Sequence, residues 1–297
     1  MRKIVSTTWP WYHRNLDNVI IRYTPFDVVR IAQELGAQEV CIRTPWRTSL
    51  YNPEWHDVLR DQLAFTDIDL SIWAVVALQY PENEARAIQT AVNRYKPVRV
   101  VIDAEDAAKQ YIANLSRFLE ALDRVGCPVG LGSYRRANYH TEMNWPKWLK
   151  YRANNGEYTI DFLAHQLYPI KVNTPAGWRK HFQLDIDSHE VYAAAVYRPG
   201  IPWLPWVPSF IGGSYEGCDV PWIPKAECLD AAITYMKERL GSRLLGVNFW
   251  SLDEDMVDIP DVYQFVKGLS AIAPTPQPNI PVFEIPKDLD QFTIKRV

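Results

Sequence analysis

The segment VRVVIDAEDAAKQYIANLSRFLEALDRVG, residues 98–126, contains the pattern from which the fold is predicted. Its apolar, β-branched beginning is typical of a buried strand over Val98–Asp103. Apolar residues then recur every three or four positions, which predicts a helix over Ala107–Val125 that Gly126 ends. The stretch is therefore one strand–helix unit, and acidic residues stand at the junction.

The same unit recurs along the rest of the chain. Further strands are predicted over 3–9, 39–44, 70–78, 128–134, 159–166, 204–210 and 244–250. Further helices are predicted over 25–35, 53–65, 82–95, 145–153, 188–196, 225–240 and 259–269. Strands that alternate with helices are joined by crossovers and pair in parallel. Eight such units predict an α/β protein built as a single (β/α)8 TIM barrel.

A doubly wound open sheet is the alternative arrangement of these units. Residues 7–14, TTWPWYHR, contain no Gly-rich phosphate-binding fingerprint after the first strand, which favours the barrel. The barrel domain is assigned to residues 1–272. Residues 273–297 contain five prolines, which favour extended chain. We expect this segment to be a Pro-rich C-terminal arm or linker through which a protein partner could attach.

Composition limits the classes of partner. The 297 residues carry a formal net charge of −3, and no basic run suggests a face for nucleic acid. No segment approaches the length of about 18 apolar residues that a membrane span needs. The first residues, MRKIVSTTWPWYHR, do not resemble a secretory signal peptide, so cytoplasmic synthesis is expected. A phage origin, with the protein carried in the virion or released by lysis, is one hypothesis for its route to a glycan.

The candidate catalytic residues are Asp103 and Glu105. They are two positions apart on an extended segment, so their side chains point to the same side at the carboxyl end of a strand, where barrel active sites form. Two carboxyl groups in one partly desolvated site repel each other, and one pKa rises. A proton is then available for a leaving group, as cleavage of a glycosidic bond requires. The alternative is that Asp103 caps the following helix and Glu105 lies in its first turn.

Other strand ends provide polar and aromatic side chains that suit a sugar. The candidate substrate-binding residues are Gln166, Tyr168, Trp250, Tyr134, Asn248, Trp9 and Asp253. Core aromatic packing and a solvated acidic loop are the alternative interpretations. The six histidines show no pair at i,i+2 or i,i+4, which argues against a metal-dependent enzyme. Neither a metal nor another cofactor is expected, and the expected partner is a carbohydrate substrate or ligand.

Two families of glycoside hydrolases resemble this sequence. VVIDAEDA, the helix after it and RVGCPVGLGSY resemble family 25, the muramidase-type lysozymes, and LAHQLYP is similar to the next strand of that family. This resemblance implies that Glu105 is the general acid and Asp103 its partner. The chain also resembles family 18, the chitinase-like hydrolases, in Asp-x-Glu, in the Gln-x-Tyr of HQLY and in the Gly-x-x-x-Trp-Ser of GVNFWS. That resemblance implies that Glu105 donates a proton while the acetamido group of the substrate attacks the sugar carbon.

Two positions depart from these families. Val101 stands where family 18 usually has a further acid, and the first strand ends in TTW, residues 7–9, where family 25 has an acidic residue. Two functions are therefore weighed. The first is a glycoside hydrolase acting on a β-linked N-acetylated glycan of the peptidoglycan or chitin type. The second is a non-catalytic barrel that binds carbohydrate or forms a structural component of a larger, possibly phage-derived, assembly.

Overall fold

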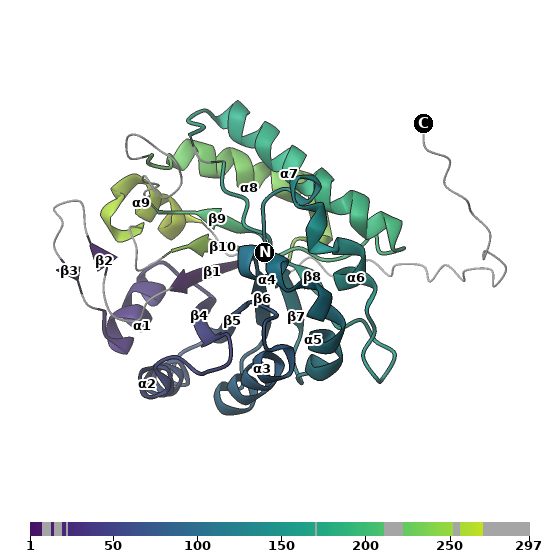
Figure 1. Ribbon diagram of the computed structural model, residues 1–297. Helices are drawn as coiled ribbons and strands as arrows, with labels where there is room; N and C mark the ends of the chain where they lie inside the picture. Colours follow the sequence, from purple (N-terminus) through teal and green to yellow (C-terminus); the bar gives the residue numbers. More distant parts are fainter. Residues whose placement is uncertain are drawn as a thin grey trace.

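One sheet of eight parallel strands forms the centre of the protein (Figure 1). The computed structural model describes residues 1–7, 13–14, 20–21, 23–169, 171–210, 222–251 and 256–269. The strand order is β8-β7-β6-β5-β4-β1-β10-β9. The bounds are β1 (Arg2–Thr7), β4 (Glu39–Trp46), β5 (Asp69–Val76), β6 (Val100–Ala104), β7 (Val129–Gly132), β8 (Phe162–Leu163), β9 (Trp206–Pro208) and β10 (Gly246–Trp250).

Main-chain hydrogen bonds join the first and last strands of this order and close the sheet into a barrel. Leu204 N donates to Leu163 O at 2.7 Å, and Trp206 N donates to His165 O at 3.0 Å. A parallel bridge between Gln166 and Trp206 extends this pairing beyond β8. The predicted (β/α)8 TIM barrel is therefore confirmed.

Helices surround the strands (Figure 1). They are α1 (Pro25–Glu34), α2 (Pro53–Leu63), α3 (Pro81–Tyr95), α4 (Asp106–Gln110), α5 (Leu115–Leu122), α6 (Trp145–Lys150), α7 (Pro175–Ala195), α8 (Ala226–Leu240) and α9 (Pro260–Gly268). Five of them begin at proline, whose fixed φ suits the first helical position, and α6 has a proline as its second residue. Only α1 combines this proline with a capping box among the described helices, formed by Thr24 and Asp27.

Three local features differ from the sequence prediction. The helix predicted over Ala107–Val125 is interrupted, because a 3-10 turn separates α4 from α5, and Asn114 there donates from Nδ2 to Leu78 O at 2.9 Å. The helix predicted over 188–196 begins instead at Pro175, since the Thr174 hydroxyl caps it by accepting from Gly177 N. The short antiparallel pair β2 (His13–Arg14) and β3 (Ile20–Ile21) was not predicted.

The interior of the barrel is packed, so it is not a pore. Its side chains come from alternate strand positions and form a cluster that is separate from the larger core between sheet and helices. Gly130 leaves room there for the Phe162 ring, which a Cβ at this position would overlap. The buried members of this inner cluster are Ile4, Cys41, Trp73, Val101, Phe162, Ala164, Leu204 and Trp206.

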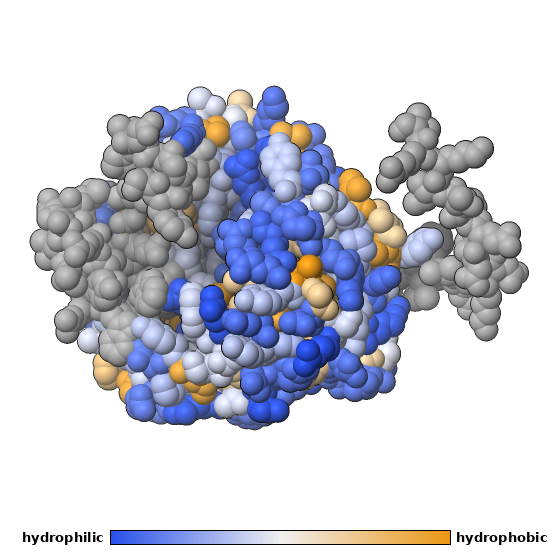
Figure 2. Space-filling model, in the orientation of Figure 1, coloured by the Kyte–Doolittle hydropathy of each residue, from blue (hydrophilic) through white to orange (hydrophobic). Residues whose placement is uncertain are grey.

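Hydrophilic residues predominate over the face seen in Figure 2, and hydrophobic residues are scattered among them. None of the helices within the described ranges has the length and apolar character that crossing a membrane requires. The predicted arm, residues 273–297, lies outside the described residues.

Candidate active site

The two candidate catalytic acids lie at the carboxyl end of β6. Val101 points into the barrel, and the alternation of the strand brings Asp103 to the same side, one step nearer the mouth. Asp103 is 8% exposed, and Glu105 is half-buried. Glu105 occupies the N-cap position of α4, but its side chain makes no capping hydrogen bond. Asp103 lies within β6 and neither side chain forms a capping hydrogen bond, so the capping of this helix by Asp103, the alternative weighed from the sequence, is not observed.

Gln166, just beyond β8, holds the two acids together. Its Nε2 donates to Oε1 of Glu105 and lies 3.4 Å from Oδ1 of Asp103. The carboxyl groups of Asp103 and Glu105 are also hydrogen-bonded to each other. The sequence placed Gln166 among sugar-binding residues, and the structure shows that its amide contacts both acids.

The environment favours a retained proton in this pair. Burial, and then the charge of Glu105, hold the pKa of Asp103 well above its ordinary value. Burial also raises the pKa of Glu105, although hydrogen bonds from Gln166 and Asp103 oppose that rise. Because the two groups interact, their protons leave in two steps that belong to the pair.

Aromatic rings form the floor beside the acids. The half-buried Trp250 ring stacks on Trp206 with centroids 5.1 Å apart, and Trp73 meets it edge-on at 5.0 Å. Tyr168 is half-buried and packs against Phe210 with ring centroids 5.5 Å apart. Trp73 and Trp206 were not singled out from the sequence, although both occupy inward positions of predicted strands.

Arg43 is a further residue of the mouth that the sequence analysis missed. It lies on β4 two residues after the inward-facing Cys41, which was the available signal. Arg43 is 8% exposed, and its guanidinium carbon lies 4.9 Å from the Trp46 ring centroid and 5.4 Å from that of Trp73. Its positive charge opposes the rise in the pKa of Asp103. Arg43 therefore balances part of the negative charge of the pair.

Tyr134 lies on the rim, where its hydroxyl donates to Asp106. Its ring stacks on His140 with centroids 3.7 Å apart, and Lys109 Nζ lies 4.5 Å from the ring centroid. Burial and the bond to Asp106 raise the pKa of Tyr134 above its ordinary value. Lys109 also forms an ion pair of 2.8 Å with Asp106. This network fixes α4, which begins directly after Glu105.

The remaining predicted site residues lie elsewhere. Asn248 is fully buried inside the barrel, where its Oδ1 accepts from Ser6 Oγ at 2.7 Å. Trp9 and Asp253 fall outside the described residues. Within the described ranges, no group of three or more His, Cys, Asp or Glu side chains could hold a metal ion.

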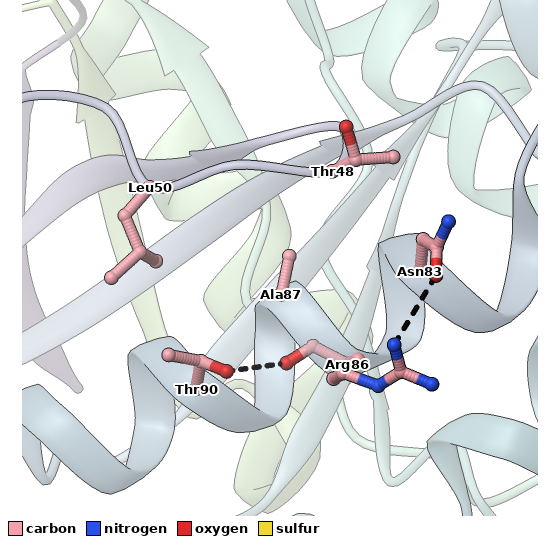
Figure 3. Close-up of a pocket in the computed structure, with 6 residues that line it drawn as sticks. All are labelled: Thr48, Leu50, Asn83, Arg86, Ala87 and Thr90. Carbon is pink, nitrogen blue, oxygen red and sulfur yellow. Dashed lines mark hydrogen bonds between the residues drawn. The ribbon is translucent and has the colours of Figure 1, made fainter.

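A hollow on the outer flank does not contain the acids. It has a volume of about 420 Å³ and lies between the turn after β4 and helix α3 (Figure 3). No carboxyl group is present among the described residues that line it, which are Thr48, Leu50, Asn83, Arg86, Ala87 and Thr90. Acid chemistry is therefore assigned to the mouth and not to this hollow.

Known structures share this fold. The chain is similar to the spore cortex-lytic enzyme SleL of Bacillus cereus, with 10% identity, coverage of 90% of this chain and 74% of the other, and a TM-score of 0.56. A class V chitinase from Pseudomonas fluorescens has 8% identity, coverage of 90% and 99%, and a TM-score of 0.59. The C-terminal domain of a putative chitinase from Desulfitobacterium hafniense has 12% identity, the same coverage and a TM-score of 0.57. No family model and no curated protein matches the sequence. The chain therefore has the TIM-barrel fold found in glycoside hydrolases.

Proposed function

We propose that this protein hydrolyses a β-linked, N-acetylated glycan of the peptidoglycan or chitin type. The observation that carries the proposal is the hydrogen-bonded pair of Asp103 and Glu105 at the mouth of the barrel. The pKa values of both acids are raised, so the pair holds a proton for a leaving group. The aromatic floor around Trp250 provides a flat apolar surface for a sugar ring.

The placement of the two acids on one strand end favours N-acetylated substrates. In hydrolases whose two carboxyl groups flank the scissile bond, these groups are about 5–5.5 Å apart in retaining enzymes and about 6.5–9.5 Å apart in inverting enzymes. Asp103 and Glu105 are two residues apart at the end of β6 and share contacts with one amide nitrogen, so they approach a sugar from the same side and do not flank the scissile bond. The nucleophile must therefore come from elsewhere, and the acetamido oxygen of the substrate is one that an N-acetylated sugar brings with it.

The reaction then needs only one proton from the protein. Asp103, which is more buried, stores the proton, and Glu105 delivers it to the glycosidic oxygen as the bond to the sugar carbon breaks. The acetamido oxygen forms the new bond to that carbon. Water then attacks the same carbon, the acetamido oxygen leaves, and the Glu105 carboxylate takes the proton from the water. Gln166 holds the two carboxyl groups in fixed positions relative to each other during both steps.

The structural neighbours support this class of substrate. They include chitinases and an enzyme described as spore cortex-lytic. These proteins share the barrel fold, but only about a tenth of their residues are identical to those of this chain. Their names therefore guide only the choice of glycans to test. The assignment of residues rests on the geometry of this chain.

A non-catalytic carbohydrate-binding barrel is the second candidate. Val101 favours it, because this side chain fills the barrel interior at the position where family 18 usually has a further acid. A protein of this kind would keep the aromatic floor and bind the same glycans without cleaving them. It would also suit a structural component of a larger assembly, with residues 273–297 as the attachment arm.

Product release from N-acetylated chito-oligosaccharides and from peptidoglycan separates the two candidates. The wild-type protein should release reducing ends, and Glu105→Gln should lower kcat by about 10²- to 10⁴-fold while glycan binding persists. Glu120→Gln, at an exposed site on α5, is the matched control and should match the wild type. Binding by all three proteins without product release from any would contradict hydrolysis and favour the binding barrel.

A further inference from the structure

Helix α7 carries a buried carboxylate that faces two consecutive arginines. Asp185 has no exposed surface, and its Oδ1 accepts from Arg136 Nε at 2.7 Å. Arg135 Nε lies 3.4 Å from the other carboxylate oxygen. Burial raises the pKa of Asp185 to about 6, although both arginines oppose this rise. A buried ion pair gives little net stability compared with apolar packing. Stability alone therefore does not explain why Asp185 is buried against these arginines.

Arg135 extends from this ion pair towards the mouth. Its Nη1 donates to the main-chain oxygen of Tyr168 at 2.9 Å, and its Nη2 lies 3.3 Å from Nδ1 of His181. The planar guanidinium holds its partners in fixed directions. One side chain therefore connects α7 with the segment after β8, where Gln166 bridges the two acids.

The loop that carries Arg135 is itself fixed to α7 on both sides. Before it, the main-chain oxygen of Tyr134 lies 3.0 Å from Nε2 of His189. After it, Ala137 N donates to Ser188 Oγ at 3.1 Å. Because both ends of the loop are bonded to α7, the main chain of Arg135 is held in place. The hydrogen bond from its guanidinium therefore holds the main chain of Tyr168 in a fixed position relative to α7.

We propose that Arg135, held by Asp185, is a positioning residue that fixes the main chain at Tyr168 and so places the Tyr168 side chain beside the acid pair. Tyr168 then contacts the sugar unit that is cleaved. This inference rests on the proposed hydrolysis of a glycan, but the connection from α7 to Tyr168 is a feature of the fold that can be measured without substrate.

Arg135→Gln, Arg135→Lys and Asp185→Asn, compared with the wild type, test the inference. Asp187→Asn is the control, because Asp187 lies on the same helix and bonds instead to Arg239 on the protein surface. Circular dichroism first shows that each variant is folded. Arg135→Gln should lower kcat on N-acetylated oligosaccharides by about 10- to 100-fold, with a smaller change in KM, since small misplacements of site groups have effects of this size. Arg135→Lys should recover part of this loss, and Asp187→Asn should equal the wild type.

Hydrogen exchange of the full chain, followed by mass spectrometry, provides the substrate-free measurement. Arg135→Gln and Asp185→Asn should speed exchange in peptides that cover residues 164–169, while β1 exchanges as in the wild type. Unchanged exchange there, or wild-type kcat and KM in Arg135→Gln, would overturn the inference. If the wild type cleaves no glycan, the proposed function fails, and the exchange measurement alone decides whether Arg135 fixes Tyr168.

Discussion

Asp103 and Glu105 are hydrogen-bonded to each other through their side chains at the carboxyl end of β6. Two carboxyl groups can form such a bond only when one of them carries a proton. The pair therefore loses its two protons at separate pH values, and catalysis that needs one of them follows a bell-shaped pH profile. The raised pKa of each acid places the alkaline limb above the ordinary range of carboxyl groups.

Asp103→Asn should move that alkaline limb to lower pH. Glu105 then titrates alone, without the negative charge that a partner carboxylate adds when the last proton leaves, so its proton is lost earlier as pH rises. The dependence of kcat/KM on pH measures the shift. An alkaline limb at the wild-type pH would mean that Asp103 does not store the proton.

Trp250→Ala should weaken glycan binding by about tenfold or more, because the ring provides much of the apolar floor together with Trp73 and Trp206. Trp250→Phe keeps an aromatic surface and should lose less affinity. Calorimetric titration with an N-acetylated oligosaccharide, on Glu105→Gln to prevent turnover, gives both values. Equal affinities for all forms would remove Trp250 from the site.

A stacked pair of buried histidines should make stability depend on pH. The His165 and His189 rings lie 3.6 Å apart and nearly parallel, and both side chains are buried. Burial lowers the pKa of His189 to about 3 and holds that of His165 well below its ordinary value. The unfolded chain therefore binds protons first as pH falls below about 6.5. The free energy of unfolding is therefore highest above that pH, where the histidines are neutral in both states. It falls as pH decreases further, because only the unfolded chain then binds the protons.

His165→Phe tests this dependence. Each buried histidine lowers the free energy of unfolding by up to about 1.4 kcal/mol per pH unit in this window, so the variant should lose less stability than the wild type between pH 6.5 and 4. Urea unfolding at several pH values gives the two slopes. Parallel slopes would show that the pKa of His165 is the same in the folded and the unfolded state.

The packing inside the barrel predicts a large effect at Gly130. A methyl group there would overlap the Phe162 ring, so Gly130→Ala should lower the free energy of unfolding by about 1–3 kcal/mol. Gly200→Ala is the matched control, because no atom lies within 4 Å of a Cβ at that position. Equal denaturation midpoints for the two variants would contradict a filled barrel interior.

The sequence was sufficient to predict the barrel because its signal is repeated. A unit like the apolar run before Asp103 and the periodic helix after it occurs eight times, and each unit favours parallel pairing. Helix α7 shows the limit of this signal. Its 21 residues do not separate clearly into a polar and an apolar side, so its amino-terminal part was missed.

The candidate site was predictable only where chemistry lies on the strands themselves. Asp103 and Glu105 follow an apolar strand, which drew attention to them. Arg43 and Asp185 were missed, because an arginine within a strand and an aspartate within a helix resemble surface residues until the fold buries them. Contacts between distant segments, such as Arg135 with Tyr168, depend on the pairing of β7 with β8 and leave no local pattern.

Cleavage of one oligosaccharide in its N-acetylated and de-N-acetylated forms shows whether the protein hydrolyses a glycan with the acetamido oxygen as nucleophile. The wild-type protein should release reducing ends from the acetylated form only, and Glu105→Gln should release far fewer. Equal cleavage of both forms by the wild type, or undiminished cleavage by Glu105→Gln, would contradict this mechanism.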